Sequence, residues 1–335
     1  MRSGQVRGSL QKLVLWIERR LHPVVSWRRL RATSRVVDPY FGYATPDHLI
    51  IRGRVLATST RRDLGQSGRL ANLRNMIALF LTDELEGVGI RHASVRTRSD
   101  EEGYFQLCLP RDAGPGWHDV TVEVEGANES VPCPVLVPSP DARFMVISDI
   151  DDTVLQTGAY SLLRNLWTTF TGSTATRHVF NDAVTLMSLL SEDARNPVYY
   201  VSSSPWNLHE FLTEIFDQAG LQRGPMFLRD LGLSETKFIT SGHGSHKGDS
   251  IDILLASNPE LPAILIGDTG QKDAEIYADA IARHPGRILA VVLRAARPGR
   301  TAVEECEALD ESGVPTFVGR DFNVLKDRLW GVLRG

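Results

Sequence analysis

Short apolar segments alternate with helical patterns through the second half of this 335-residue chain, and this alternation limits the fold most. Continuous apolar strands are typical of parallel sheets that are buried on both faces, and helices between them supply the crossovers. We therefore predict a doubly wound α/β domain over residues 143–335. The predicted strands lie at 144–148, 197–201, 263–266 and 288–293, and the predicted helices at 178–191, 206–219, 247–256 and 272–283.

The preceding segment, residues 41–135, has a β pattern. Strands are predicted at 48–55, 93–97, 104–109 and 119–124. An acidic turn with Gly103 is expected to join the second and third of these as a hairpin. A helical pattern at 69–85 reads as an insertion. This segment has a strand, then an acidic turn, then Tyr-Phe. The order resembles small sandwich modules of the transthyretin or immunoglobulin-like kind. Closely spaced prolines predict a stiff linker at 136–142.

Residues 1–40 are predicted to form a basic amphipathic segment. Nine basic residues and one acidic residue give residues 1–35 a net charge of +8, so the other 300 residues carry −12 of the total of −4. Apolar residues recur at helical spacing among these charges, beside Trp16 and Trp27. Two interpretations stand. The helix lies on an anionic membrane surface, or it packs its apolar face on the protein's own core.

Composition narrows the setting of the chain. No apolar run approaches the roughly 20 residues that span a bilayer, and the basic start lacks the pattern of a secretory signal. The three cysteines are few and widely spaced, which argues against a disulfide scaffold or a zinc site. We expect a cytoplasmic protein, peripheral at the membrane if the basic segment binds lipid.

Polar side chains follow the ends of the predicted parallel strands, where sites in open α/β sheets form. Carboxylates crowd the first strand end, and such groups repel one another unless a cation or proton offsets them. Carboxylates, hydroxyls and one lysine are the parts of a magnesium-assisted phosphoryl-transfer site with a carboxylate nucleophile. The candidates are Asp149, Asp151, Ser202, Ser203 and Asp268, with Lys247 and Asp273 at the starts of two predicted helices.

These motifs occur in the order found in the haloacid dehalogenase superfamily, and the resemblance covers about residues 143–300. Within it the chain resembles the actin-patch-associated phosphatidate phosphatases. The motifs behind this are Asp-Ile-Asp-Asp-Thr at 149–153, Tyr-Val-Ser-Ser-Ser-Pro-Trp at 200–206, Leu-Arg-Asp at 228–230 and Gly-Asp-Thr-Gly-Gln-Lys-Asp at 267–273.

The resemblance implies a role for each candidate. Asp149 attacks phosphorus and forms an aspartyl-phosphate, and Asp151 protonates the leaving group. Mg²⁺ is held by Asp149, the backbone carbonyl of Asp151, and Asp268. Asp273 is either a further metal ligand or a carboxylate that holds a metal ligand in place without contacting the metal. A hydroxyl, from Ser202 or its competitor Ser203, bonds the phosphoryl group, which Lys247 also pairs with.

The favoured activity is magnesium-dependent hydrolysis of phosphatidate, a lipid phosphomonoester, to diacylglycerol and phosphate at an anionic membrane surface. A short insertion at 160–170 leaves room for such a bulky substrate. Three alternatives remain open: a phosphatase of soluble phosphomonoesters, a non-catalytic lipid- or protein-binding module on the same fold, and processing of nucleic-acid ends. The last is disfavoured because the catalytic half shows no basic stripe, so no nucleic-acid partner is expected. The sequence leaves the oligomeric state open.

Overall fold

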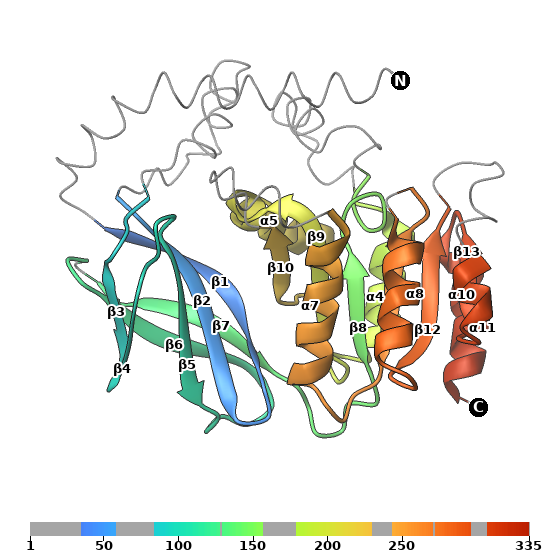
Figure 1. The fold of residues 1–335 in the computed structure, drawn as a ribbon, viewed down its shortest axis with the longest axis horizontal. Helices are drawn as coiled ribbons and strands as arrows, with labels where there is room; N and C mark the ends of the chain where they lie inside the picture. The colour runs from blue at the N-terminus through green and yellow to red at the C-terminus, as the bar shows by residue number, and fades with distance from the viewer. Residues whose placement is uncertain are drawn as a thin grey trace, which may run out of the picture.

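The structure is a computed structural model that describes residues 35–57, 84–127, 129–156, 179–229, 243–270, 272–295 and 307–334. It contains a mixed seven-stranded sheet and a parallel six-stranded sheet, which lie side by side with helices around the second (Figure 1). The basic segment with Trp16 and Trp27, the insertion at 160–170, Cys306 and most of the helical pattern at 69–85 fall outside the described residues.

The six-stranded sheet confirms the predicted α/β class. Its order is β10-β9-β8-β11-β12-β13, and every neighbouring pair is parallel. The strands are β8 (Met145–Asp149), β9 (Val198–Pro205), β10 (Met226–Arg229), β11 (Ala263–Asp268), β12 (Ile288–Arg294) and β13 (Thr316–Gly319). Among these, β10 and β13 were not predicted, because four residues carry too little periodicity.

Helices cover both faces of this sheet. Alternate residues of each strand face opposite sides, so Val146 joins one core while Met145 and Ile147 join the other. The first core packs against α4 (Asn181–Ser191), α5 (His209–Ala219) and α11 (Phe322–Arg334), with the 3-10 helix η2 (Trp206–Leu208) before α5. The second packs against α7 (His243–Ser257), α8 (Asp273–Arg283) and α10 (Glu307–Glu311). In Figure 1, α7 and α8 lie in front of β8 and α4 lies behind it.

The mixed sheet has the order β4-β3-β6-β7-β1-β2-β5. Its strands are β1 (Val36–Ala44), β2 (His48–Leu56), β3 (Gly89–His92), β4 (Val95–Arg98), β5 (Tyr104–Pro110), β6 (Gly116–Val124) and β7 (Val131–Val137). β1 pairs antiparallel with β2 but parallel with β7. The strands hydrogen-bond in one continuous order around a single core, and the likeness to a sandwich stays a prediction.

One prediction about this half was wrong. The strand at 93–97 does not form a hairpin with the strand at 104–109; β4 pairs with β3, and β5 pairs with β2. The acidic turn redirects the chain instead, because Asp100 accepts hydrogen bonds from the backbone N–H groups of Glu102 and Tyr104. Pro132 and Pro134 lie in β7, and the chain between the sheets covers residues 138–144, against the linker predicted at 136–142.

Apolar side chains join the two sheets. Tyr43, Ile50 and Leu136 of the mixed sheet are buried in the same core as Tyr199 and Phe227 of the parallel sheet. This shared core fixes the mixed sheet against β9 and β10, next to the strand ends where the predicted site lies. Cys108 and Cys133, the two cysteines among the described residues, are free thiols.

Candidate active site

The parallel sheet reverses its winding between β8 and β11. From β8 the chain builds outward to β9 and β10, then crosses back to β11 and continues to β12 and β13. A crevice opens at such a switch point, beyond the carboxyl ends of the strands. The register aligns Ser148 with Ile266, so Asp149 and Asp268, the last residues of their strands, end at the same edge.

Asp149 forms a buried ion pair with Lys247. The Lys247 Nζ lies 2.8 Å from the Asp149 Oδ1, and both side chains are at most 3% exposed. Lys247 reaches this point from the first turns of α7, which packs along β9. The same Nζ lies 2.5 Å from the Asp273 Oδ1. The structure therefore brings three of the predicted residues into direct contact.

Asp273 uses both of its carboxylate oxygens inside the site. Its Oδ1 contacts Lys247, and its Oδ2 accepts a hydrogen bond of 3.2 Å from the Asp268 backbone N–H. Gly267 makes this approach feasible, because a Cβ there would lie 2.6 Å from the Asp273 Oδ2. Asp273 therefore holds Lys247 and the end of β11 in place.

Asp151 lies in a different environment from Asp149. Its Oδ2 accepts hydrogen bonds from the hydroxyls of Ser202, at 2.7 Å, and Ser204, at 2.9 Å. β9 continues to Pro205, beyond the predicted end at residue 201, so alternation places Ser202 and Ser204 on one side and Ser203 on the other. Ser202 is therefore the serine of the site, and Ser204 joins it. We predicted contact between Ser202 and a phosphoryl group, and the contact seen is with Asp151.

The turn after β8 orients the carboxylates of Asp149 and Asp151. Asp152 adopts a left-handed backbone conformation with φ 57°, which aspartate tolerates better than most residues. The Thr153 hydroxyl donates to the Asp149 Oδ2 at 3.3 Å, and the Thr153 carbonyl accepts from the Arg294 Nε at 2.9 Å. Arg294, at the end of β12, also pairs with Asp182 of α4. Sequence reasoning missed Thr153, Ser204 and Arg294, because their roles depend on contacts between distant segments.

Burial and mutual repulsion shift the pKa values of these groups. Burial raises the pKa of Asp149 well above its usual range, opposed by Lys247 and reinforced by Asp273. Burial also raises the pKa of Asp151, although its two serine donors oppose the shift. Burial and then Asp273 raise the pKa of Asp268 to about 7. Burial disfavours the charge of Lys247, but Asp149 and Asp273 outweigh it and raise its pKa.

The residues fit a divalent cation. Carboxylate oxygens of Asp149, Asp268 and Asp273 lie within 4.8 Å of one another, and all three residues are buried. With Lys247 the ionised cluster carries a charge of −2. Among the described residues, no hydrogen-bond donor reaches the buried Oδ2 of Asp268. Mg²⁺ prefers such carboxylate oxygens, and a dication would offset the cost of burying them.

Asp268→Asn is expected to stabilise the metal-free protein. The amide oxygen keeps the hydrogen bond from the Gly270 backbone N–H, while the amide group replaces the carboxylate oxygen that has no donor. Loss of a buried, repelled charge should raise the melting temperature in EDTA by a few degrees, since about 1 kcal/mol corresponds to roughly 2–4 °C in a domain of 150–250 residues. Scanning calorimetry with and without Mg²⁺ measures this, and Mg²⁺ should stabilise the variant less than the parent chain. A lower melting temperature in EDTA would contradict the repulsion argument.

Comparison with known proteins bears out the resemblance drawn from the motifs. Residues 144–295 match the family model described as the catalytic domain of phosphatidate phosphatase APP1. The chain thus resembles the APP1 phosphatidate phosphatases. The matched span runs from the residue before β8 to the residue after β12, so it contains every predicted site residue.

Relatives extend the similarity beyond this span. Phosphatidate phosphatase APP1 of Saccharomyces cerevisiae is 26% identical over 234 residues, which are 68% of this chain and 39% of that one. An uncharacterised protein of Schizosaccharomyces pombe is 30% identical over 159 residues, or 44% of this chain and 24% of that one. A solved structure of a candidate β-phosphoglucomutase from Thermotoga maritima gives a TM-score of 0.31 at 15% identity, covering 55% of this chain and 99% of that one. This chain therefore spans well under half the length of the two yeast relatives.

Proposed function

We propose that the chain is a magnesium-dependent phosphomonoester phosphatase that acts through an aspartyl-phosphate, with phosphatidate as its substrate. The observation that carries the proposal is the separation of two neighbouring carboxylates. Asp149 pairs with a lysine, whereas Asp151 accepts bonds from two serine hydroxyls. Titratable groups in one site whose environments differ in this way are suited to different steps of catalysis.

In the first step an Asp149 oxygen attacks phosphorus, and the bond from phosphorus to the ester oxygen breaks. Asp151 donates its proton to that oxygen, which leaves as an alcohol. A raised pKa suits this role, because the acid must carry a proton near neutral pH. In the second step a water attacks phosphorus and gives its proton to Asp151. The bond from phosphorus to Asp149 breaks, phosphate leaves, and both carboxyl groups return to their starting states.

Lys247 orients Asp149 and offers its charge to the phosphoryl oxygens, while Asp273 holds the lysine in place. Asp149, Asp268 and the backbone carbonyl of Asp151 would hold Mg²⁺, which when bound offsets negative charge on the phosphoryl group. The Ser202 hydroxyl is then free to serve either Asp151 or the phosphoryl group as the reaction proceeds.

Phosphatidate is the proposed substrate for two reasons. The yeast relative is named for hydrolysis of this lipid, and residues 1–35 carry a charge of +8 that suits an anionic surface. Among the described residues, no helix has the length and apolar character to cross a bilayer. We propose that the protein is cytoplasmic and meets its lipid substrate from the membrane surface.

Phosphate release from a panel of substrates tests this function. We expect hydrolysis of phosphatidate in mixed micelles that stops on chelation with EDTA and returns with excess Mg²⁺, because the site needs a dication to offset its charge. Glycerol 3-phosphate, sugar phosphates and nucleotides provide the soluble arm. Faster turnover of a soluble ester would favour the alternative of a soluble-substrate phosphatase. Full activity after exhaustive chelation would contradict the metal requirement, and no turnover in either arm would favour a binding module.

A further inference from the structure

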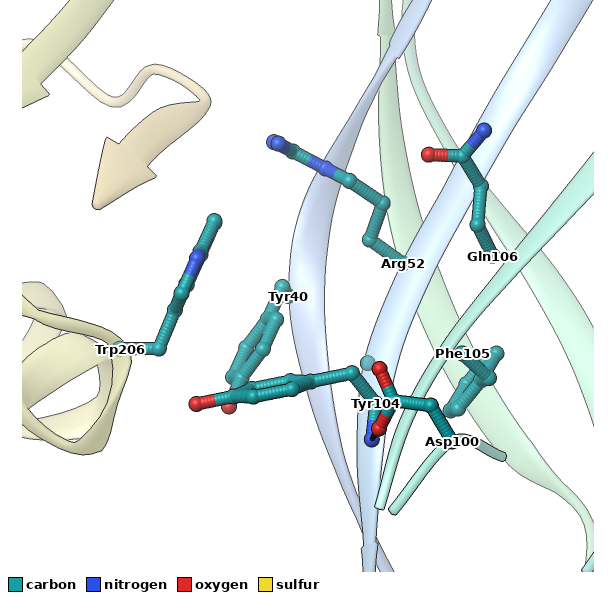
Figure 2. Close-up of a pocket in the computed structure, with 8 residues that line it drawn as sticks. Tyr40, Arg52, Asp100, Tyr104, Phe105, Gln106 and Trp206 are labelled. Carbon is teal, nitrogen blue, oxygen red and sulfur yellow. Dashed lines mark hydrogen bonds between the residues drawn. The ribbon is translucent and has the colours of Figure 1, made fainter. Parts of the chain in front are cut away.

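A pocket lies between the two sheets, away from the carboxylate cluster. It has a volume of about 260 Å³ and is bordered by the mixed sheet and by the residue that follows β9 (Figure 2). Tyr40 comes from β1, Arg52 from β2 and Gln106 from β5. Trp206 closes the opposite side, where Figure 2 shows its ring standing across from Arg52 and Tyr40.

Arg52 is a cation with no anionic partner among the described residues. One of its Nη atoms donates to the Phe41 carbonyl at 2.8 Å and to the Met226 carbonyl at 3.1 Å. Its guanidinium carbon lies 4.5–5.1 Å from the ring centres of Tyr43, Trp206 and Phe227. Across the part of the chain that the structure describes, no carboxylate lies within ion-pair distance of it.

The environment of Arg52 is costly for a charge. Burial lowers the pKa of Arg52 to about 10, against a small opposing effect of Tyr43. The Arg52 Nε is buried and has no hydrogen-bond acceptor among the described residues. The Nε2 of the neighbouring His209 likewise has no partner among them. Arg52 is half-buried as a whole, but its Nε is shielded from water, and charged groups shielded in this way are normally paired. An anion in the pocket would supply the missing partner.

The walls of the pocket combine aromatic rings with polar side chains. Tyr40 and Trp206 stack with ring centres 4.4 Å apart and planes 14° from parallel, and Tyr104 lies 6.3 Å from Tyr40 at a tilt. Asp100 also borders the pocket, and its carboxylate opposes a bound anion, although two backbone N–H groups of its own turn donate to its Oδ1 and offset part of that effect. The side chains of Gln106 and Arg52 come from directly paired positions of β5 and β2.

The pocket is connected to the catalytic edge through β9. Trp206 follows Ser202 by four residues, and an extended chain rises about 3.3 Å per residue, so roughly 13 Å separate the two positions. A group bound beside Trp206 would therefore lie near the catalytic centre without entering it.

We propose that this pocket is a second anion site, which binds a phosphate or carboxylate group through Arg52 beside the rings of Tyr40, Tyr104 and Trp206. The anion is either the headgroup of a neighbouring lipid or a soluble ester. The proposal concerns binding alone and does not require that the chain be a phosphatase.

Charge changes at Gln106 test this site without touching the Arg52 contacts. Gln106 is exposed and lies opposite Arg52 on the paired strand. Gln106→Glu would place a carboxylate beside the guanidinium and repel an anion, whereas Gln106→Lys would attract one. Gln218, exposed on α5, provides matched controls with the same charge changes, Gln218→Glu and Gln218→Lys. Melting curves of all four variants establish that they fold.

Binding is measured in EDTA, where the catalytic cluster keeps its negative charge, with anions that a phosphomonoesterase does not cleave. Dimethyl phosphate followed by calorimetry is the soluble arm, and phosphatidylcholine vesicles with and without phosphatidylglycerol are the lipid arm. We expect Gln106→Glu to weaken binding at least about tenfold, equivalent to roughly 1.4 kcal/mol, and Gln106→Lys to strengthen it. The arm that shows this difference identifies the source of the anion.

Three results would overturn the proposal. The first is no binding of either probe by the parent chain. The second is equal binding by the parent chain and both Gln106 variants, in which case Arg52 serves only to fasten the two sheets. The third is an equal response to the Gln218 variants, which would indicate general charge attraction. If Gln106→Glu alone fails to fold, the Gln106→Lys comparison decides between the same outcomes.

Discussion

Asp149→Asn should abolish turnover and leave the fold intact. The amide has the shape of the carboxylate, and its oxygen can still face Lys247 while its NH2 group donates to the Thr153 hydroxyl, but it cannot form a stable bond to phosphorus. Loss of a covalent nucleophile commonly costs several powers of ten in kcat, so we expect a fall of at least about a thousandfold. Lys247 keeps its contact with Asp273 in the variant, so the rest of the site stays in place.

Asp152→Asn is the matched control for this variant. It makes the same chemical change three residues away, at a position whose left-handed backbone asparagine adopts readily. Asp152 is not in the cluster around Lys247, so its variant should keep near-normal turnover. Acid quenching with ³²P-labelled substrate should trap label on the parent chain and on Asp152→Asn, and none on Asp149→Asn. Turnover of Asp149→Asn above about a hundredth of the parent rate would exclude Asp149 as the nucleophile.

The part of the candidate site that depends only on sheet topology could be predicted from the sequence. Parallel strands bring their carboxyl ends to one edge, so Asp149, Asp268 and the start of the serine run had to meet there. The contacts of Asp273 with Lys247 and with the Asp268 backbone could not be predicted, since no spacing rule says which oxygen of a carboxylate is occupied. Whether Asp273 also touches a metal stays a prediction.

The serine run shows where sequence reasoning stopped short. We ended the strand at residue 201 because polar residues begin there, and so Ser202 and Ser203 competed for one role. β9 continues to Pro205, and its alternation pairs Ser202 with Ser204 around Asp151. The buried Asp151 carboxylate accepts hydrogen bonds from these hydroxyls, so polar residues can end the strand without loss of stability. The sequence does not show this contact, because Asp151 lies 51 positions before Ser202.

In the fold, strands buried on both faces were located well, whereas strands with mixed or proline-containing sequences were missed. β8 and β11 begin within one residue of their predicted starts, because continuous burial on both faces leaves a clear pattern. β1 and β7 were missed for a physical reason. β1 mixes aromatic and polar residues because part of it faces the parallel sheet, and β7 contains two prolines that indicate a linker. The composition of these two strands depends on contacts with distant segments, and the local periodicity of the sequence carries no information on such contacts.

Asp151→Asn should separate the two chemical steps. An alkyl ester such as phosphatidate has a poor leaving group that needs a proton, so its single-turnover rate should fall by about 10²–10⁴. A 4-nitrophenyl ester leaves without that proton, so the first step should proceed at nearly the parent rate. The second step still needs Asp151 to take a proton from water. Stopped-flow measurement should therefore show a burst of about one equivalent of 4-nitrophenolate per chain, followed by slow turnover. Such a burst reports that the phosphorylated enzyme accumulates.

The pH dependence provides an independent test of the same role. Burial raises the pKa of Asp151, so its acid form persists to higher pH than that of an ordinary aspartate. The single-turnover rate on the alkyl ester should fall as pH rises through this pKa, because the proton donor is lost. Asp151→Asn has no such proton, so its slower rate should lack this decline, whereas Asp152→Asn should retain it. An equal loss on both esters, with no burst and with the decline in rate unchanged, would show that Asp151 is needed only to shape the turn after β8.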